Sequence, residues 1–344
     1  MEPILNTLYV MTQGALLRLD HGTLKVSVEK QTKIQIPLLH LSTICCFGRV
    51  TPSLGLIHRC AEDGRTLVFF DEHGRFKARL AGPVSGNVLL RRAQHLVLSD
   101  AERPLTIARW FVAGKLQNAR ASLLRAARDA TAEADINVLK AAAETIATAI
   151  RRLPLAVTAD HLRGIEGDAS RTYFAAFNCM IRPDDRPAFA IAGRNRRPPR
   201  DRTNALLSFL YALLVNDCAS AAEGVGLDPQ VGFLHALRSG RPALALDLME
   251  ELRPVLADRL ALTLVNRRQL AAEDFDERPG GAVMLNERGR KAVVVAYQKR
   301  KQDEVQHAVL DRRVPLGLVP HLQARLLARH LRGGLDAYPP FLHR

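Results

Sequence analysis

Two short segments of the chain contain residue types that could bind a metal ion. His235 comes first, and the run 247–254 follows it with Asp247 and Glu250 three residues apart. At that spacing on a helix, two carboxylates share one face. Histidine and carboxylate groups are common ligands of divalent ions, but most carboxylate pairs of this kind lie on solvated faces and bind nothing. The two segments therefore suggest a metal site without establishing it.

A third acidic residue, Glu166, lies between two glycines, Gly164 and Gly167, in a segment that otherwise has helical periodicity. A glycine destabilises a helix by roughly 1 kcal/mol relative to alanine, so a pair of them needs a reason. Close approach of another helix or of a phosphate would supply one. The alternative is a helix that simply begins near residue 168.

Together, Glu166, His235 and Glu250 would offer two carboxylates and one imidazole. That set suits Mn²⁺ or Mg²⁺ with open water positions better than a closed zinc site. Such a site is typical of phosphodiester chemistry, in which the ion stabilises developing charge on a phosphate. The chain has no GxxxxGK[ST] loop and no nucleophile motif beside a base, which argues against ATP-driven chemistry and against a covalent enzyme intermediate.

The charge of the chain points to a polyanionic partner. Its 344 residues include 49 Lys+Arg and 35 Asp+Glu, for a formal net charge of +14. Arginine supplies most of the positive charge; a GC-rich genome would also raise its count, but not the net charge. We expect Arg238 and Arg241 to clamp phosphate groups of that partner. An arginine-rich loop either does the same or pairs with Asp201 and other local acids; its members are Arg194, Arg196, Arg197, Arg200 and Arg202.

Cysteine usage and hydropathy indicate a cytoplasmic protein with no membrane partner. The five cysteines are an odd number with no C-x-x-C pair, as in reduced core thiols. No uninterrupted apolar run approaches the roughly 20 residues that span a bilayer. The first residues lack the basic start and cleavage site of a signal peptide.

The hydrophobic pattern predicts an α+β multidomain protein, with a small β-rich domain at residues 1–80 and a larger all-α catalytic domain at 87–332. A linker is expected at 81–86, and a variable or disordered tail at 333–344. Asp228 and Pro229 have the N-cap and N1 residue types of a helix that would carry His235. The turn at 239–242 would let a second helix fold back and bring Glu250 within reach of that histidine.

The order of several motifs resembles a known family. The motifs are Glu166-Gly-x-x-x-Arg-x-Tyr173, the segment 193–214 from Gly-Arg-Asn-Arg-Arg to Tyr-Ala-Leu-Leu, Gly226-Leu-Asp-Pro-x-x-Gly-Phe-Leu-His235, and Leu246-Asp-Leu-Met-Glu-Glu-Leu-Arg-Pro254. Together they closely resemble the CRISPR-associated spacer-acquisition endonuclease and integrase family, the first-numbered and universal CRISPR-associated protein. The adjacent glutamates 250 and 251 look like the type I-C form.

The resemblance implies a metal-dependent DNA endonuclease and integrase. Such an enzyme joins the 3′-hydroxyl ends of captured foreign DNA to the repeat of a CRISPR array by transesterification. By the same resemblance, Glu166, His235 and Glu250 bind the ion, Asp247 is a further acidic residue close to it, and Glu251 is a solvated bystander. Tyr211 lies either near the DNA end, as the resemblance implies, or in the core with a satisfied hydroxyl.

The resemblance also implies partners. Double-stranded DNA binds both as the captured fragment and as the CRISPR repeat. The chain is expected to form a homodimer through its β domain and to assemble with a dimer of the small second-numbered CRISPR-associated protein; an accessory end-trimming nuclease is a further candidate. Two other functions share the residues and the charge, namely a metal-dependent DNA repair nuclease without integration activity and a non-catalytic DNA scaffold.

Overall fold

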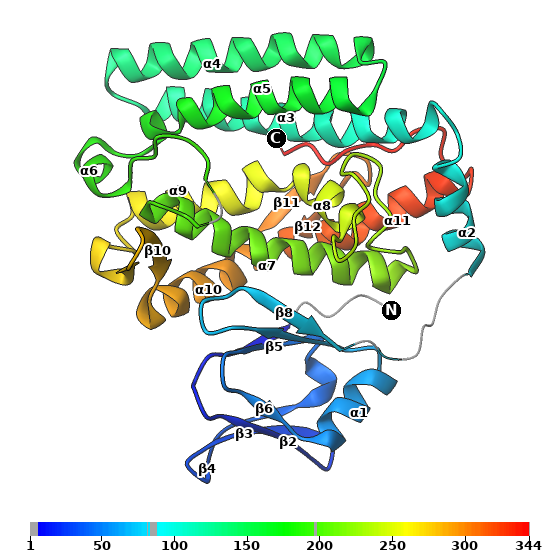
Figure 1. Ribbon diagram of the computed structural model, residues 1–344, viewed down its shortest axis with the longest axis vertical. Helices are drawn as coiled ribbons and strands as arrows, with labels where there is room; N and C mark the ends of the chain where they lie inside the picture. The colour runs from blue at the N-terminus through cyan, green and yellow to red at the C-terminus, as the bar shows by residue number, and fades with distance from the viewer. Residues whose placement is uncertain (1–5, 81, 83–87, 196–197, 344) are drawn as a thin grey trace. The chain divides into compact units, whose positions relative to one another are not determined.

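The structure is a computed structural model that describes residues 6–80, 82, 88–195 and 198–343. It divides into two compact units (Figure 1). The first comprises Met1–Ser85 with Asn286–Lys301, and the second Gly86–Leu285 with Gln302–Arg344. Helix α10 (Glu287–Gln302) thus groups with the amino-terminal strands rather than with the expected domain at 87–332. Most of the expected linker at 81–86 lies outside the described residues.

The first unit is built from two four-stranded sheets, with strand orders β1-β5-β7-β8 and β4-β3-β2-β6. Leu24 and Val26 on one face of β3 are buried, which is the period-two pattern that the sequence shows. Helix α1 (Leu54–Glu62) begins at Ser53, whose hydroxyl accepts a hydrogen bond from the backbone of Leu56. The strands are β1 (Thr7–Val10), β2 (Leu16–Asp20), β3 (Thr23–Val28), β4 (Gln31–Pro37), β5 (Thr43–Phe47), β6 (Thr51–Pro52), β7 (Thr66–Phe70) and β8 (Phe76–Arg79).

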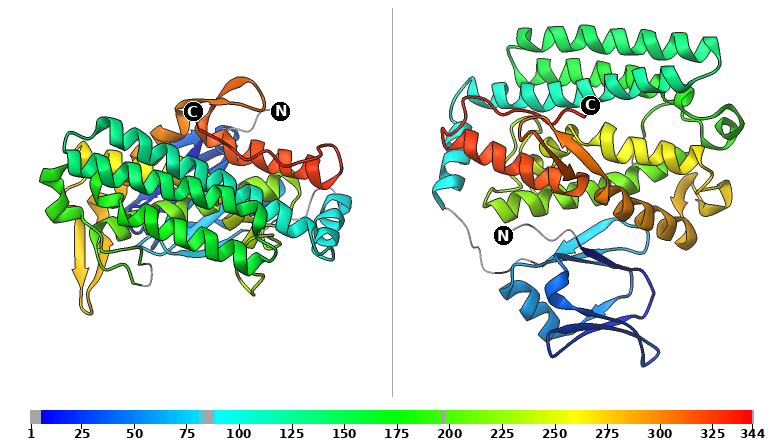
Figure 2. Two further views of the ribbon diagram at one scale, coloured as in Figure 1. Left: turned by 90° about the horizontal axis from the view of Figure 1, so that it is seen from above. Right: turned by 180° about the vertical axis from the view of Figure 1, so that it is seen from behind.

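The second unit is mainly helical, and α3, α4 and α5 lie side by side in it (Figures 1 and 2). The alanine-rich stretch at 119–152 is helical as expected, but it is divided between α3 and α4 at residues 130–132. That turn contains no glycine or proline, so the local sequence does not predict it. The helices are α2 (Val88–Val97), α3 (Arg103–Asp129), α4 (Glu133–Arg152), α5 (Ala159–Ala175), α6 (Arg186–Phe189), α7 (Arg202–Val225), α8 (Ala243–Glu250), α9 (Arg259–Asn266) and α11 (Val319–Leu331).

Short elements complete the two units. A π-helical turn, η5 (Arg253–Asp258), follows α8 closely and leads directly into α9. Two antiparallel hairpins are present beside the helices of the second unit. They are β9 (Phe275–Arg278) with β10 (Ala282–Leu285), and β11 (Glu304–His307) with β12 (Arg312–Pro315). The 3₁₀ turns are η1 (Leu38–His40), η2 (Leu153–Leu155), η3 (Phe177–Met180), η4 (Pro183–Asp185), η6 (Ala272–Asp274) and η7 (Leu316–Leu318).

Helix α7 is the core helix of the second unit. The carboxylate of Asp201 caps it by accepting a hydrogen bond from Asn204 N at 2.7 Å, and Gly226 ends it in the left-handed conformation at φ 93°. Among the described residues, α7 is the one helix long and apolar enough to cross a membrane, but 72% of its most apolar window is buried inside the protein. Its hydrophobicity is therefore explained by packing.

The carboxyl-terminal tail is held in place, contrary to the expectation of disorder. Tyr338 and Phe341 are buried, and both donate hydrogen bonds to the Glu251 carboxylate, from the Tyr338 hydroxyl at 2.5 Å and from Phe341 N at 2.7 Å. Asn118 on α3 donates to Phe341 O at 2.8 Å. Glu251 is fully buried, so its prediction as a solvated bystander is wrong. A tail folded back onto α3 encloses this carboxylate, and no local pattern reveals that contact.

Candidate active site

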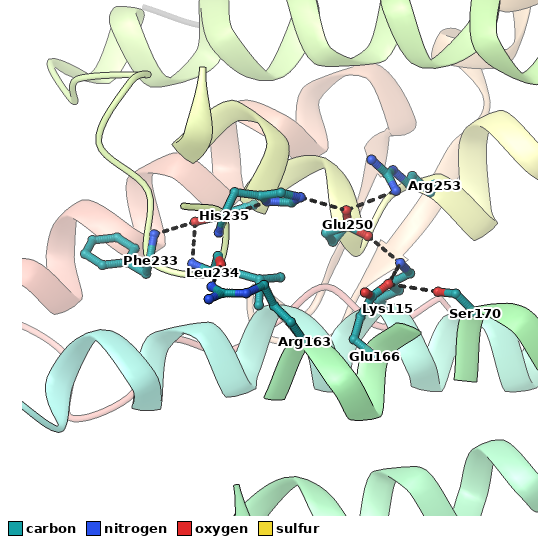
Figure 3. Close-up of polar contacts among 10 residues, drawn as sticks. Lys115, Arg163, Glu166, Ser170, Phe233, Leu234, His235, Glu250 and Arg253 are labelled. Atoms are coloured by element: carbon teal, nitrogen blue, oxygen red, sulfur yellow. Dashed lines mark hydrogen bonds and ion pairs between the residues drawn. The ribbon is translucent and has the colours of Figure 1, made fainter. Parts of the chain in front are cut away.

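The three predicted ligands come together from three separate elements (Figure 3). Glu166 lies on α5, His235 on the irregular loop 226–242, and Glu250 at the end of α8. His235 Nε2 is 3.7 Å from Glu250 Oε1. The Lys115 ammonium, from α3, lies between the two glutamates; it pairs with Glu166 and is 2.7 Å from Glu250 Oε2. The turn at 239–242 thus brings the histidine and Glu250 together, as expected.

Asp247 positions the histidine. Its Oδ1 accepts a hydrogen bond from the His235 backbone N–H at 3.0 Å and lies 2.7 Å from His235 Nδ1. Since a carboxylate can only accept, Nδ1 carries the proton and the lone pair of Nε2 is directed toward Glu250. The buried Asp247 is therefore next to the candidate metal ligands, and its oxygens are occupied by the loop.

The segment that carries His235 is not helical, so the expected helix from residue 228 is wrong. Asp247 Oδ2 accepts hydrogen bonds from Phe233 N at 2.6 Å and Leu234 N at 3.0 Å, which bend the backbone around the carboxylate. Gly232 lies so close to α8 that an added Cβ would be 2.6 Å from the Ala243 carbonyl carbon. The favourable N-cap and N1 residues were overridden by this tertiary contact, since capping preference is worth only about 1 kcal/mol.

Positive charge keeps Glu250 ionised although it is buried. Burial alone would raise the pKa of Glu250, but chiefly the charges of Arg253 and Lys115 lower that pKa from 4.5 to about 2. Arg253 NH1 is 3.0 Å from Glu250 Oε1. Glu250 Oε2 touches the Lys115 ammonium but accepts no well-aligned hydrogen bond. A buried carboxylate with an incompletely satisfied oxygen is suited to a cation.

Two of the explanations offered for the glycines beside Glu166, a neighbouring helix and a helix start near residue 168, do not fit the structure. Helix α5 begins at Ala159 after a Thr158 cap, not near residue 168, and a Cβ added at Gly164 or Gly167 would meet nothing within 4 Å. No helix of the described chain approaches them. Within α5, the Ser170 hydroxyl donates a hydrogen bond to Glu166 Oε1 at 2.8 Å. The glycines leave open space on either side of the glutamate, which is room for a ligand outside the chain.

The oxygen and nitrogen donors of Glu166, His235 and Glu250 suit a divalent ion, although their present positions do not enclose one. Within the described ranges, no three His, Cys, Asp or Glu side chains converge closely enough to hold a metal. Lys115 accounts for this, because its ammonium lies between Glu166 and Glu250. A site that already holds a monovalent cation between two carboxylates, with an imidazole nitrogen beside them, has the chemistry that Mn²⁺ or Mg²⁺ requires.

Tyr211 lies in the core behind the site. Its hydroxyl donates a hydrogen bond to Asp258 Oδ1 at 2.6 Å. The guanidinium groups of Arg194 and Arg253 lie 5.2 Å and 4.8 Å from the centroid of its ring. Burial raises the pKa of Asp258 to about 6. The structure therefore gives Tyr211 the packing role, with a satisfied hydroxyl.

The predicted arginines have different environments. Arg194 is half-buried, and it donates hydrogen bonds to Asn204 Oδ1 at 2.6 Å and Ser208 at 3.1 Å. Arg200 and Arg238 are exposed, and Arg241 is half-buried in the turn that follows His235. Arg196 and Arg197 lie outside the described residues. The Asp201 carboxylate accepts side-chain hydrogen bonds from Asn195 and Asn204.

A groove of about 790 Å³ in the second unit is lined by many arginines that the sequence did not single out. It shares Tyr173 and Pro254 with a small cavity beside Lys115, so the two hollows are neighbours. Its arginines lie on α3, at the ends of short turns and on α9, too far apart in sequence to form a motif. They are Arg125, Arg128, Arg182, Arg186, Arg259 and Arg267.

Sequence reasoning also missed two residues at the centre of the site. Arg253 could have been found, because it is three residues after Glu250 on a helical segment and pairs with it. Lys115 gave no such signal, since it is a single lysine in α3 that is 51 residues from Glu166.

Comparison with known proteins identifies the family of this chain. The family model described as "CRISPR associated protein Cas1" matches residues 8–299. The CRISPR-associated endonuclease Cas1 1 of Moorella thermoacetica is 61% identical over 344 residues, covering all of both chains. A CRISPR-associated exonuclease Cas4/endonuclease Cas1 fusion of Rhodospirillum rubrum is 35% identical over 98% of this chain and 57% of its own length. The chain belongs to the Cas1 family of CRISPR-associated proteins.

Solved structures show the same fold. The Cas1 protein TM1797 of Thermotoga maritima matches with a TM-score of 0.80 and 26% identity, over 95% of this chain and 97% of that one. A chain in a Cas6-RT-Cas1–Cas2 complex matches with a TM-score of 0.83 and 22% identity, over 100% of this chain and 37% of that one. The resemblance to the type I-C form stays a prediction.

Proposed function

We propose that this protein is a metal-dependent DNA endonuclease and integrase that joins the 3′-hydroxyl ends of captured DNA fragments to a CRISPR repeat by transesterification. The observation that carries the proposal is that the Lys115 ammonium bridges Glu166 and Glu250, and that His235 Nε2 lies 3.7 Å from Glu250 Oε1. The names of the relatives, which are CRISPR-associated endonucleases, support the nuclease class.

Each side chain has a definable role in this proposal. Glu166, Glu250 and Nε2 of His235 would hold Mn²⁺ or Mg²⁺, which supplies Lewis-acid stabilisation of a phosphodiester under attack by a hydroxyl. Asp247 keeps the proton on Nδ1 of His235 and so presents Nε2. Arg253 holds the Glu250 carboxylate in its orientation from the opposite side. Exchange of one phosphodiester for another needs no ATP, in agreement with the absence of a P-loop motif.

The arginine-lined groove is the best-supported path for a DNA strand in this unit. A strand that follows it would reach the site past Tyr173 and Pro254, which line both the groove and the cavity beside Lys115. Arginine contacts to phosphates position DNA without reading its bases, so broad tolerance of fragment sequence is expected. Arg238, exposed on the loop that carries His235, would contact DNA close to the reacting phosphate.

The proposed partners follow from the relatives. One structural neighbour is part of a complex with Cas2, and one curated relative is fused to a Cas4 exonuclease. We therefore propose a Cas2-type dimer as the assembly partner and a Cas4-type nuclease as the accessory end-trimming enzyme. A homodimer formed through the first unit, and action in the cytoplasm, complete the proposal.

An integration assay tests the function. The purified protein, with its Cas2-type partner, is mixed with a short 3′-hydroxyl DNA duplex, a supercoiled plasmid carrying the repeat, and Mn²⁺. Joined products are expected, and they should be absent with EDTA, with 3′-dideoxy ends, or with Glu166→Gln. Nicking without any joined product would indicate a repair-type nuclease instead. Joining that survives Glu166→Gln, His235→Ala and Glu250→Gln alike would overturn the proposed site.

A further inference from the structure

We propose that Lys115 is an internal placeholder cation, which holds the two metal-binding glutamates together before the ion binds and is displaced when it arrives. This inference rests on the metal site of the proposed function and deepens it. It concerns a residue that lies outside the set Glu166, His235 and Glu250 and that comes from a different helix, α3.

The position of the Lys115 ammonium carries the argument. It pairs with Glu166 and is 2.7 Å from Glu250 Oε2, so one cation already bridges two of the three proposed ligands. The side chain of Lys115 is 11% exposed and that of Glu250 3%, so water does little to screen the charges. Two carboxylates forced together in such a place would repel each other without a cation between them. Lys115 supplies that cation from within the chain.

The second cation at the site cannot play the same part. Arg253 pairs with Glu250 at 3.0 Å, but its guanidinium is buried and lies over the Tyr211 ring, which fixes it in place. Lysine differs because its charge is compact and is carried on a flexible four-carbon stem. Lys115 can therefore move away from the carboxylates by rotation of its own side chain, whereas Arg253 would have to leave a packed position.

A cavity next to Lys115 gives the displaced ammonium a place to go. This cavity is about 20 Å³ and is lined by Lys115, Ser170, Tyr173 and Phe174 among others. That volume holds about one water molecule, which is close to the size of an ammonium group. Tyr173 and Pro254 line both this cavity and the arginine-lined groove, so a lysine turned into the cavity would lie close to the proposed DNA path.

The consequence is a metal site that is pre-assembled but weakened in affinity. An ion that enters must replace a cation already paired with its ligands, and it gains less than it would at two free carboxylates. Removing the ammonium while keeping the volume of the side chain should therefore strengthen metal binding. If Lys115 only supported the fold, or if it helped to hold the glutamates while the metal is bound, its removal would instead weaken metal binding.

Direct Mn²⁺ binding tests the inference. Calorimetry or the electron paramagnetic resonance signal of free Mn²⁺ gives the dissociation constant for the full-length wild type and for Lys115→Met. We expect the variant to bind Mn²⁺ about tenfold more tightly or better, because a like charge next to the ion has been removed. A matched control is Lys301→Met, which removes another buried ammonium from α10 of the other unit and should leave the constant unchanged.

Thermal unfolding provides the second readout. Without metal, Lys115→Met should melt at a lower temperature than the wild type, and saturating Mn²⁺ should raise its melting temperature by more than it raises that of the wild type. Lys115→Gln, which keeps a polar end without charge, replaces the methionine variant if that variant does not fold. If the Lys115 variants bind Mn²⁺ no more tightly than the wild type, and the wild type still carries out strand transfer, the placeholder role of Lys115 is wrong but the proposed function stands. Absence of Mn²⁺ binding by every protein overturns the metal site with it.

Discussion

His235 and Asp247 are joined twice, because Asp247 Oδ1 is the partner of both the backbone nitrogen of His235, at 3.0 Å, and its ring nitrogen Nδ1, at 2.7 Å. One carboxylate oxygen therefore fixes both the position and the tautomer of the histidine. The other oxygen, Oδ2, holds the backbone of the two preceding residues. The histidine loop is in effect folded around Asp247.

Asp247→Asn should therefore damage the fold as well as the site. In the variant, the amide N–H group of asparagine would face backbone or ring N–H groups that now donate to a carboxylate oxygen. Two donors cannot pair, so we expect the free energy of unfolding to fall by roughly 3 kcal/mol. Mn²⁺ binding should weaken because Nε2 is no longer presented. Denaturant unfolding and calorimetry measure the two effects. Asp276→Asn, on the exposed face of β9, serves as the control and should change neither. A stable variant with normal metal binding would show that the carboxylate does not position His235.

Gly232→Ala and Gly164→Ala should have opposite effects on stability. An alanine at 232 would lie 2.7 Å from Asp247 Oδ2 and close to the Ala243 backbone, so a loss of roughly 1–3 kcal/mol is expected. An alanine at 164 meets nothing within 4 Å and lies inside a helix, where it should add about 0.5–1 kcal/mol. Denaturant unfolding compares the two variants.

The same glycine face offers a test of DNA approach. If the space beside Glu166 receives DNA, Gly164→Ala and Gly167→Ala should lower strand transfer while the protein becomes more stable. Unchanged strand transfer in the stabilised variants would mean that DNA does not come close to this face of α5.

Tyr211→Phe should lower stability more than activity. Loss of the hydroxyl leaves Asp258, a buried acid, without its 2.6 Å partner, which should reduce the free energy of unfolding by about 1–3 kcal/mol. Most of the strand-transfer activity should remain, since the ring still packs against Arg194 and Arg253. Loss of activity without loss of stability would instead favour a position of Tyr211 at the DNA end.

The stability of the protein should fall as the pH rises from about 4.5 to about 7. Burial raises the pKa of Glu251 from 4.5 to about 7 despite hydrogen bonds from Tyr338, Phe341 and Gln323. In this range the folded state binds the proton more tightly than the unfolded state does, so each step up in pH favours unfolding. The total effect of this group is on the order of 3 kcal/mol. Glu251→Gln should flatten the profile in chemical denaturation, and an unchanged slope would contradict the assignment.

Arginines of the groove should control the salt dependence of DNA binding. Arg128→Gln removes one cation from the groove wall, and the slope of log K against log salt should decrease by about 0.7–0.9 if that cation contacts a phosphate. Arg59→Gln, which removes a cation paired with Asp63 in the other unit, is the matched control. Fluorescence anisotropy over a range of salt concentrations measures both. Equal slopes for the two variants would place the DNA elsewhere.

Much of this protein follows from local sequence. Period-two alternation predicted the strands of the first unit, and apolar periodicity predicted the long helices of the second, because both patterns reflect which side of an element is buried. Glu166, His235 and Glu250 could be chosen because their residue types limit the chemistry, and because the order of motifs around them resembles one family. The turn at 239–242 also made the approach of His235 to Glu250 predictable.

Tertiary structure alone decided the rest. The loop at 228–235 has helix-initiating residues, yet it is not helical, because the buried Asp247 carboxylate binds three of its backbone N–H groups. Glu251 is next to Glu250 in sequence and was expected in solvent, but the tail returning to α3 buries it. Lys115 enters the site from a helix distant in sequence. In each case the decisive contact joins residues far apart in the chain, and a linear pattern records the period of an element but not which distant element will pack against it.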